Sequence, residues 1–137
     1  MARGLALTLA LSFAAGGALA GDTSMKAIMA DAVNPAALAF WAGGNDPPEN
    51  EMPAQAKARW AAAVAGAKVL QEKGRLLMAS PYTRSGRWND DARLMVATAM
   101  EGEASAAKQD AAMAFEVGGR LYDACDGCHK TYVPRRE

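Results

Sequence analysis

The chain has 137 residues and carries 15 basic and 15 acidic side chains, so its formal net charge at neutral pH is zero. This length suffices for one domain with a single modest core. The balanced charge offers no electrostatic footprint for nucleic acid and no polybasic membrane anchor, which argues against both kinds of partner.

The first twenty residues have the features of a secretory signal peptide. One charge, Arg3, precedes an apolar stretch, and Ala18-Leu19-Ala20 is a site for signal peptidase. The apolar stretch is well short of the ~20 residues that span a bilayer. The alternative, a retained N-terminal helix, is disfavoured because polar residues follow the site abruptly. We therefore expect residues 1–20 to be cleaved and residues 21–137 to form one periplasmic domain without a membrane span.

The rest of the chain favours helices. Alanine dominates, together with leucine, methionine, lysine, arginine and glutamate, and runs of β-branched residues with period two are absent. Pro53 suits a first helical turn, Asn89 or Asp90 can cap a third helix, and Asp110 can cap a fourth. The sequence predicts four helices, over about residues 24–43, 53–79, 89–108 and 111–129.

Pro35 lies inside the first predicted helix. A proline within a helix lacks the N–H that the helix needs and clashes with the preceding turn. We therefore expect the first helix to be kinked or broken near Val33.

The last predicted helix carries Phe115, Gly118, Tyr122, Cys125 and His129 at spacings of three and four residues. Such spacings keep the five residues on one face of the helix. Four amphipathic helices with short connections predict an antiparallel four-helix bundle. In that topology the start of the first helix and the end of the last lie at the same end of the bundle.

The stretch Cys125-Asp126-Gly127-Cys128-His129 contains both cysteines and the one histidine of the chain. C-x-x-C-H is the attachment signature of c-type haem. Thiols three residues apart on a helix lie on one side, so each can add to one vinyl group of the same porphyrin, and His129 can then bind the iron. Attachment of this kind follows export in bacteria, which agrees with the signal peptide. The motif predicts one covalent haem c, near the end of the last helix.

Three other uses of the motif are weaker. A thioredoxin-type C-x-x-C lies at the start of a helix, where the dipole stabilises a thiolate, whereas this one lies at the end. A zinc site needs a fourth ligand, which no further cysteine or histidine supplies. If the cysteines were merely buried thiols and the histidine a helix cap, the clustering of these three residues would be a matter of chance. A disulfide across so short a loop would constrain the unfolded chain little.

With this motif near its C-terminus, the chain resembles the class II c-type cytochromes, a group that includes cytochrome c prime. The resemblance covers the mature chain in architecture, and Cys125, Cys128, His129 and Tyr132 match the C-x-x-C-H-x-x-Y form usual in that family. It implies a four-helix bundle with haem near the end of the last helix. It also implies a distal residue early in the first helix, where this chain has Met29.

Bundle topology independently brings several methionines to the haem end, namely Met25, Met29, Met78 and Met95. Met29 is the expected sixth ligand, and Met25, one turn earlier, is the alternative. A third possibility is that the iron has no sixth ligand from the protein. For the other methionines we expect core filling, since methionine is a flexible packing residue.

Aromatic and basic residues near that end have expected roles as well. Trp88 precedes the third helix and is expected to pack on the porphyrin. Trp41 lies ~18 Å along the helix from the distal position and is not expected to touch it. Lys130, Arg135 and Arg136 can pair with haem propionates or form a solvated tail.

These features predict a one-electron carrier rather than an enzyme. Imidazole and thioether ligation would make the haem six-coordinate, and methionine raises its potential. The alternative is a five-coordinate protein of the cytochrome c prime kind, which binds nitric oxide or carbon monoxide. Redox proteins and the cytochrome c maturation machinery are the expected partners. The sequence does not distinguish a monomer from a homodimer.

Overall fold

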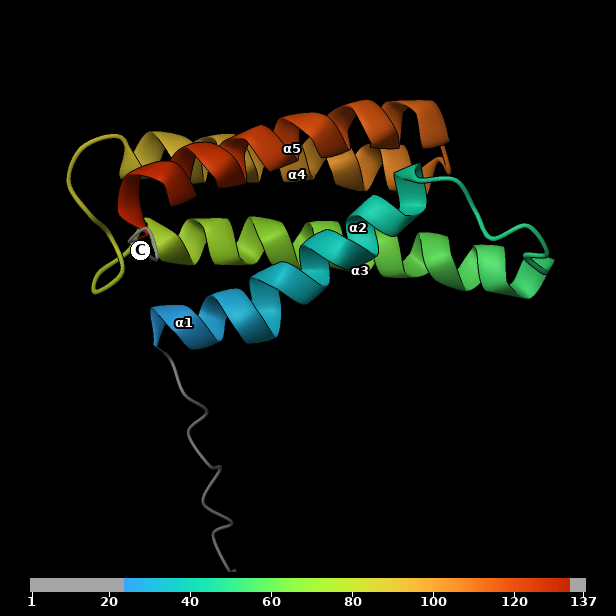
Figure 1. Cartoon of the computed structure of the whole chain (residues 1–137), viewed down its shortest axis with the longest axis horizontal. Coiled ribbons are helices and arrows are strands. Elements are labelled where there is room, and N and C mark those ends of the chain that lie inside the picture. The colour runs from blue at the N-terminus through green and yellow to red at the C-terminus, as the bar shows by residue number, and fades with distance from the viewer. Residues whose placement is uncertain (1–23, 134–137) are drawn as a thin grey trace, which may run out of the picture.

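The computed structural model describes residues 24–133, which form an all-helical bundle (Figure 1). The first long helix consists of three segments that follow one another without a loop, and three single helices come after it. No strand occurs within residues 24–133, and the predicted all-helical class is therefore confirmed, with four long helices compatible with a four-helix bundle. The elements are α1 (Met25–Ala27), the π-helical η1 (Ile28–Val33), α2 (Asn34–Gly44), α3 (Pro53–Leu77), α4 (Trp88–Ala107) and α5 (Ala111–Tyr132).

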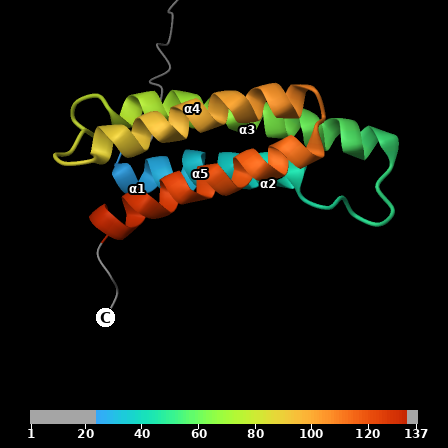
Figure 2. The same cartoon turned by 90° about the horizontal axis from the view of Figure 1, so that it is seen from above.

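Each helix packs against the next along the chain, and α2 also packs against α5, which closes the bundle. Figures 1 and 2 show α1, the α3–α4 loop and the end of α5 together at one end of the bundle. This is the end predicted to hold the C-x-x-C-H motif. Within the described residues, no helix is both long and apolar enough to cross a membrane. The predicted signal peptide, residues 1–20, lies outside the described residues.

Most of the predicted helix starts agree with the structure. The Ser24 hydroxyl accepts a hydrogen bond from the Ala27 N–H at 3.1 Å, and the Asp110 carboxylate accepts one from the Met113 N–H at 3.0 Å. The prediction that Asn89 or Asp90 caps the third helix is wrong, because α4 begins earlier, at Trp88, without a side-chain cap. Asp90 falls instead in the first turn, where a negative charge favours the helix dipole.

Pro35 does not break the first helix. The turn before it widens into η1, in which the N–H of Asn34 donates to the carbonyl of Met29, five residues earlier. The helix then continues as α2 with Pro35 in its first turn. The expected disruption near Val33 is therefore a π-helical turn that ends at that residue.

Small residues form most of the buried face of α5. Phe115 and Tyr122 are 67% and 59% exposed, and the buried residues are the smaller Ala114, Val117, Gly118, Leu121 and Ala124. The face that runs from Phe115 to His129 is therefore only partly buried. Next to it α2 approaches closely, because a Cβ on Gly118 would lie only 2.9 Å from the Trp41 ring.

Candidate functional site

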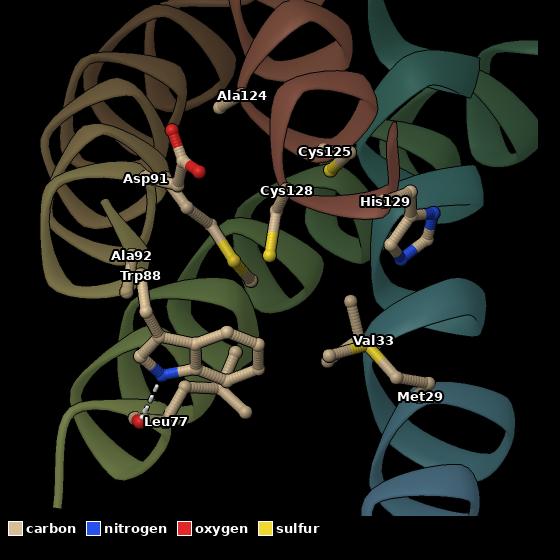
Figure 3. A pocket seen from close by; sticks show the side chains of 11 residues that line it. Met29, Val33, Leu77, Trp88, Asp91, Ala92, Ala124, Cys125, Cys128 and His129 are labelled. Carbon is tan, nitrogen blue, oxygen red and sulfur yellow. Dashed lines mark hydrogen bonds between the residues drawn. The ribbon is translucent and has the colours of Figure 1, made fainter. Parts of the chain in front are cut away.

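The last turns of α5 carry the C-x-x-C-H motif at the end of the bundle that α1 and η1 also reach. Cys125 and Cys128 are free thiols and are half-buried, and His129 is exposed. Figure 3 shows His129 and Met29 on different helices beside the same space. The structure therefore brings the predicted proximal and distal residues to one region.

The first and last helices separate at this end. The Cα atoms of α2 approach those of α5, but within the described chain no Cα atom of α1 or η1 comes within 8 Å of one in α5. Two open cavities adjoin in the gap. Met29, Val33, Cys125 and His129 line both.

The smaller cavity has a largely apolar lining. Val33, Leu77, Trp88, Ala92 and Met95 contribute to it. Trp88 is buried, and its indole N–H donates to the Leu77 carbonyl at 2.7 Å, which fixes the ring in the cavity wall. Trp88 therefore lies beside the motif, and its packing on a porphyrin stays a prediction.

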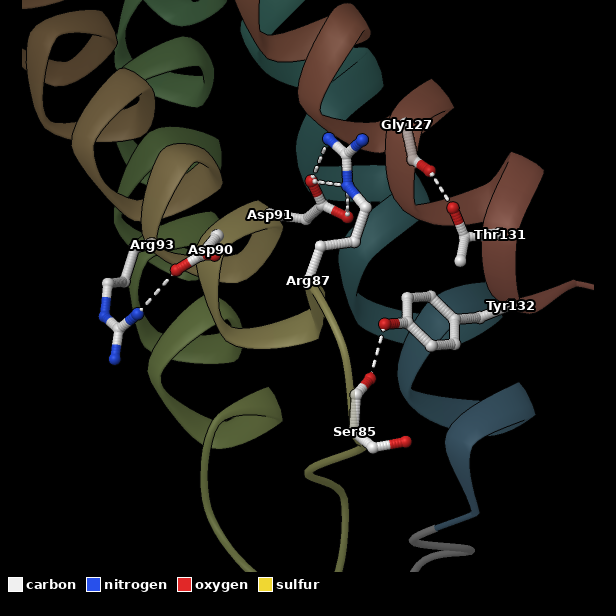
Figure 4. Close-up of polar contacts among 8 residues, drawn as sticks. All are labelled: Ser85, Arg87, Asp90, Asp91, Arg93, Gly127, Thr131 and Tyr132. Atoms are coloured by element: carbon white, nitrogen blue, oxygen red, sulfur yellow. Dashed lines mark hydrogen bonds and ion pairs between the residues drawn. The ribbon is translucent and has the colours of Figure 1, made fainter.

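Asp91 is the acidic residue in this lining, and it is only 3% exposed. Arg87 donates to both of its carboxylate oxygens, at 2.7 to 3.0 Å (Figure 4). The hydrogen bonds to Asp91 raise the pKa of the Arg87 guanidinium. A buried carboxylate needs such a partner, because an unpaired charge is expensive to remove from water.

Gly127, between the two cysteines, lets α5 approach this ion pair. A Cβ at that position would lie 3.3 Å from Nη2 of Arg87 and 3.7 Å from Oδ1 of Asp91. The middle of the motif therefore packs directly on the first turn of α4. Thr131 adds a local bond, because its hydroxyl donates to the Gly127 carbonyl at 3.0 Å.

The electrostatics of the two thiols differ from those of a redox-active C-x-x-C pair. Burial raises the pKa of Cys125. Burial is also the main cause that raises the pKa of Cys128, with a further contribution from the Asp91 carboxylate. Reactive redox cysteines have a lowered pKa, so the environment here favours thiols that stay protonated. In residues 24–133, no three His, Cys, Asp or Glu side chains cluster as a metal site would need.

Tyr132 does not line either cavity but supports the wall of one. Its ring meets the Trp88 ring edge to face, with centroids 5.0 Å apart and an interplanar angle of 86°. Its hydroxyl donates to the carbonyl of Ser85 at 2.6 Å (Figure 4). Tyr132 thus ties the turn that contains His129 to the loop between α3 and α4.

The methionines predicted at this end have different surroundings. Met29 lines both cavities and Met95 lines one, whereas Met25 and Met78 pack against the core and line neither. The geometry therefore favours Met29 over Met25 as the residue facing His129. The basic residue Lys130 pairs with Asp126 at 2.6 Å, while Arg135 and Arg136 lie outside the described residues.

Sequence reasoning missed Trp41, which lines the larger cavity with Met29 and His129. Its indole N–H donates to the carbonyl of Gly118 at 3.0 Å. That partner lies on α5, 77 positions along the chain, so no local pattern could have indicated the contact. A residue expected to lie away from the site therefore forms part of its wall.

The residues present fit a covalently attached porphyrin. Two half-buried thiols, one imidazole and one thioether line one largely apolar gap between helices that stay apart. The chain matches no family model, no curated protein and no solved structure. Its likeness to the class II c-type cytochromes therefore rests on Cys125, Cys128, His129, Tyr132 and the all-helical architecture.

Proposed function

We propose that this protein is a periplasmic one-electron carrier of the class II c-type cytochrome kind, with one haem c attached to Cys125 and Cys128. The observation that carries the proposal is the shared gap, because His129 and Met29 line it from helices that are kept apart. Haem held by an imidazole and a thioether supplies a one-electron couple of raised potential.

The chain's own residues have distinct roles in this proposal. The sulfurs of Cys125 and Cys128 would attach the group, and His129 and Met29 would ligate its iron. A thioether needs no deprotonation to bind, in contrast to a lysine, whose pKa of ~10.4 opposes ligation at neutral pH. Trp88 and Val33 would offer the group an apolar contact surface.

Partners follow from this function. The cytochrome c maturation machinery would attach the haem after export, and redox proteins would donate and accept the electron. The same cavity without Met29 ligation would leave an open iron position, as in a five-coordinate protein that binds nitric oxide or carbon monoxide. The side chain at position 29 therefore separates the two functions.

The test is expression with the haem maturation machinery, followed by a denaturing gel stained for haem and by absorption spectra. We expect the wild type to keep its haem stain after denaturation and to show the weak long-wavelength sulfur-to-iron charge-transfer band. The variant C125A with C128A should lose all stain. A wild type without covalent haem would overturn the proposal. A wild-type protein that is high-spin and binds carbon monoxide readily would replace the carrier with the gas-binding function.

A further inference from the structure

The turn that contains Met29 is the one irregular turn of the first helix. Residues 28–33 form η1, and the N–H of Asn34 donates to the Met29 carbonyl across five residues rather than four. A π-helical turn accommodates one more residue than an α-helical turn, and such turns often occur at functional sites. Here it ends at Val33, two residues before Pro35.

The extra residue changes which side chain faces the core. Phe40, in α2, is almost completely buried, and Met29 lies eleven residues before it. Eleven residues are about three turns of a regular α-helix, so an uninterrupted helix would turn Met29 toward the core with Phe40. In the structure Ile28 is the buried residue, at 8% exposure, and Met29 is half-buried on the cavity wall. One residue corresponds to about 100° of rotation.

Pro35 accounts for the wide turn. In an α-helix its N–H would bond with the carbonyl of Asp31, but proline has no N–H and its ring clashes with that carbonyl. Widening the preceding turn relieves the clash while the Asn34 N–H still finds an acceptor. Pro35 itself is exposed, so it adds no core contact that would explain its place.

We propose that Pro35 is a positioning residue for the sixth iron ligand. By holding η1 in its π-helical form, it rotates Met29 off the line of Phe40 and onto the cavity wall that His129 also lines (Figure 3). The inference rests on the proposed function, because Met29 must ligate the iron for its orientation to matter. If it holds, a residue six positions from the ligand determines how Met29 is oriented.

The test is P35A in the holoprotein. Alanine restores the N–H and removes the ring, so the turn can close to four residues and carry Met29 toward the core. We expect the sulfur-to-iron charge-transfer band to be lost and carbon monoxide to bind the reduced protein, with a cooperative thermal melt retained. The control is P53A in the first turn of α3, which should leave the band unchanged.

A second variant tests the rotation itself. Deletion of Ala30, an exposed residue of η1, from P35A removes the one extra residue. A regular α-helix would then return Met29 to the same face as in the wild type. We expect the band to return and carbon monoxide binding to fall back to the wild-type level.

Four outcomes would overturn this inference. P35A could keep the full band, or the deletion could fail to restore it in a protein with a native melt. P35A could also lose its cooperative melt, which would make Pro35 a requirement of the fold. The fourth outcome is a wild-type spectrum without the band, which would show that Met29 does not ligate the iron. Because this spectrum is recorded before any variant is made, failure of the proposed function is distinguished from failure of the inference.

Discussion

The two ends of the bundle use the same first and last helices in opposite ways. At one end, α2 and α5 touch, with the Trp41 indole bonded to the Gly118 carbonyl at 3.0 Å. At the other end, η1 stays apart from α5. The gap between them contains two cavities, both of which Met29 and His129 line. We call these the closed end and the open end.

The difference teaches how a chain rich in alanine leaves a cleft at one end of its bundle. At the closed end glycines let large rings approach a neighbouring backbone, as Gly102 does for Phe40, whose ring would lie 2.8 Å from an added Cβ. At the open end the rings of Trp88 and Tyr132 hold α4 and α5 in place, and the first helix diverges. The closed end therefore supplies its own packing, whereas under the proposed function haem would fill the open end.

The largest expected effect comes from loss of the haem proposed to fill the open end. The double variant C125A with C128A should fold at the closed end but melt at a much lower temperature than the haem-loaded wild type. Burial of roughly 200 Å² of apolar surface is worth about 5 kcal/mol, which corresponds to a shift on the order of 20 °C for a domain of this size. Thermal unfolding followed by circular dichroism measures the shift.

Hydrogen exchange would locate the loss within the chain. In the double variant, amides of α1 and η1 should lose protection more than those near Phe40 and Gly102. Equal melting temperatures for the two proteins would contradict the view that the open end depends on its ligand.

The place of the motif at the open end was predictable, because the motif ends the last predicted helix and the order of helices brings that end beside the first. The haem proposed for Cys125, Cys128 and His129 stays a prediction from their spacing. Met29 was predictable only through the topology and the family resemblance. Trp41 was not predictable, because its partner lies on another helix.

The core was harder to predict for a different reason. Small side chains carry almost no hydrophobic periodicity, and the buried face of α5 is made largely of them, so the spacing of Phe115 and Tyr122 did not indicate which face is buried. The disturbance by Pro35 was predictable, but its form was not. Whether a proline breaks, bends or widens a helix depends on the packing of both flanking segments, here Ile28 and Phe40.

The next largest effect would sharpen the description of the closed end. G102A places a Cβ at 2.8 Å from the ring of Phe40, so the ring or α4 must shift. The matched control is G119A on α5, where a Cβ would meet nothing within 4 Å. Both changes gain helix propensity, worth about 0.5–1 kcal/mol, and only G102A overpacks the core, at a cost of about 1–3 kcal/mol.

We therefore expect G119A to be neutral or slightly stabilising and G102A to be less stable than G119A by about 1–3 kcal/mol. Denaturant unfolding of the two holoproteins measures the difference. Their haem spectra should match the wild type, because neither Gly102 nor Gly119 lines either cavity. Equal stability of the two variants would show that Phe40 is not confined by α4.

The smallest effect concerns how the open end holds the last turn of α5. Y132F removes the hydroxyl that donates to the Ser85 carbonyl at 2.6 Å but keeps the ring against Trp88. Since Ser85 is exposed and its carbonyl can bond with water instead, the loss should be near the lower limit for a neutral hydrogen bond, about 0.5 kcal/mol. Y132L also removes the aromatic pair, which adds about 0.5–1.5 kcal/mol. Unfolding of both holoproteins measures these losses of stability. Their haem absorption spectra report on the ligation of iron by His129. A spectrum changed by Y132F alone would show that the hydroxyl, rather than the ring, orients the turn that carries His129.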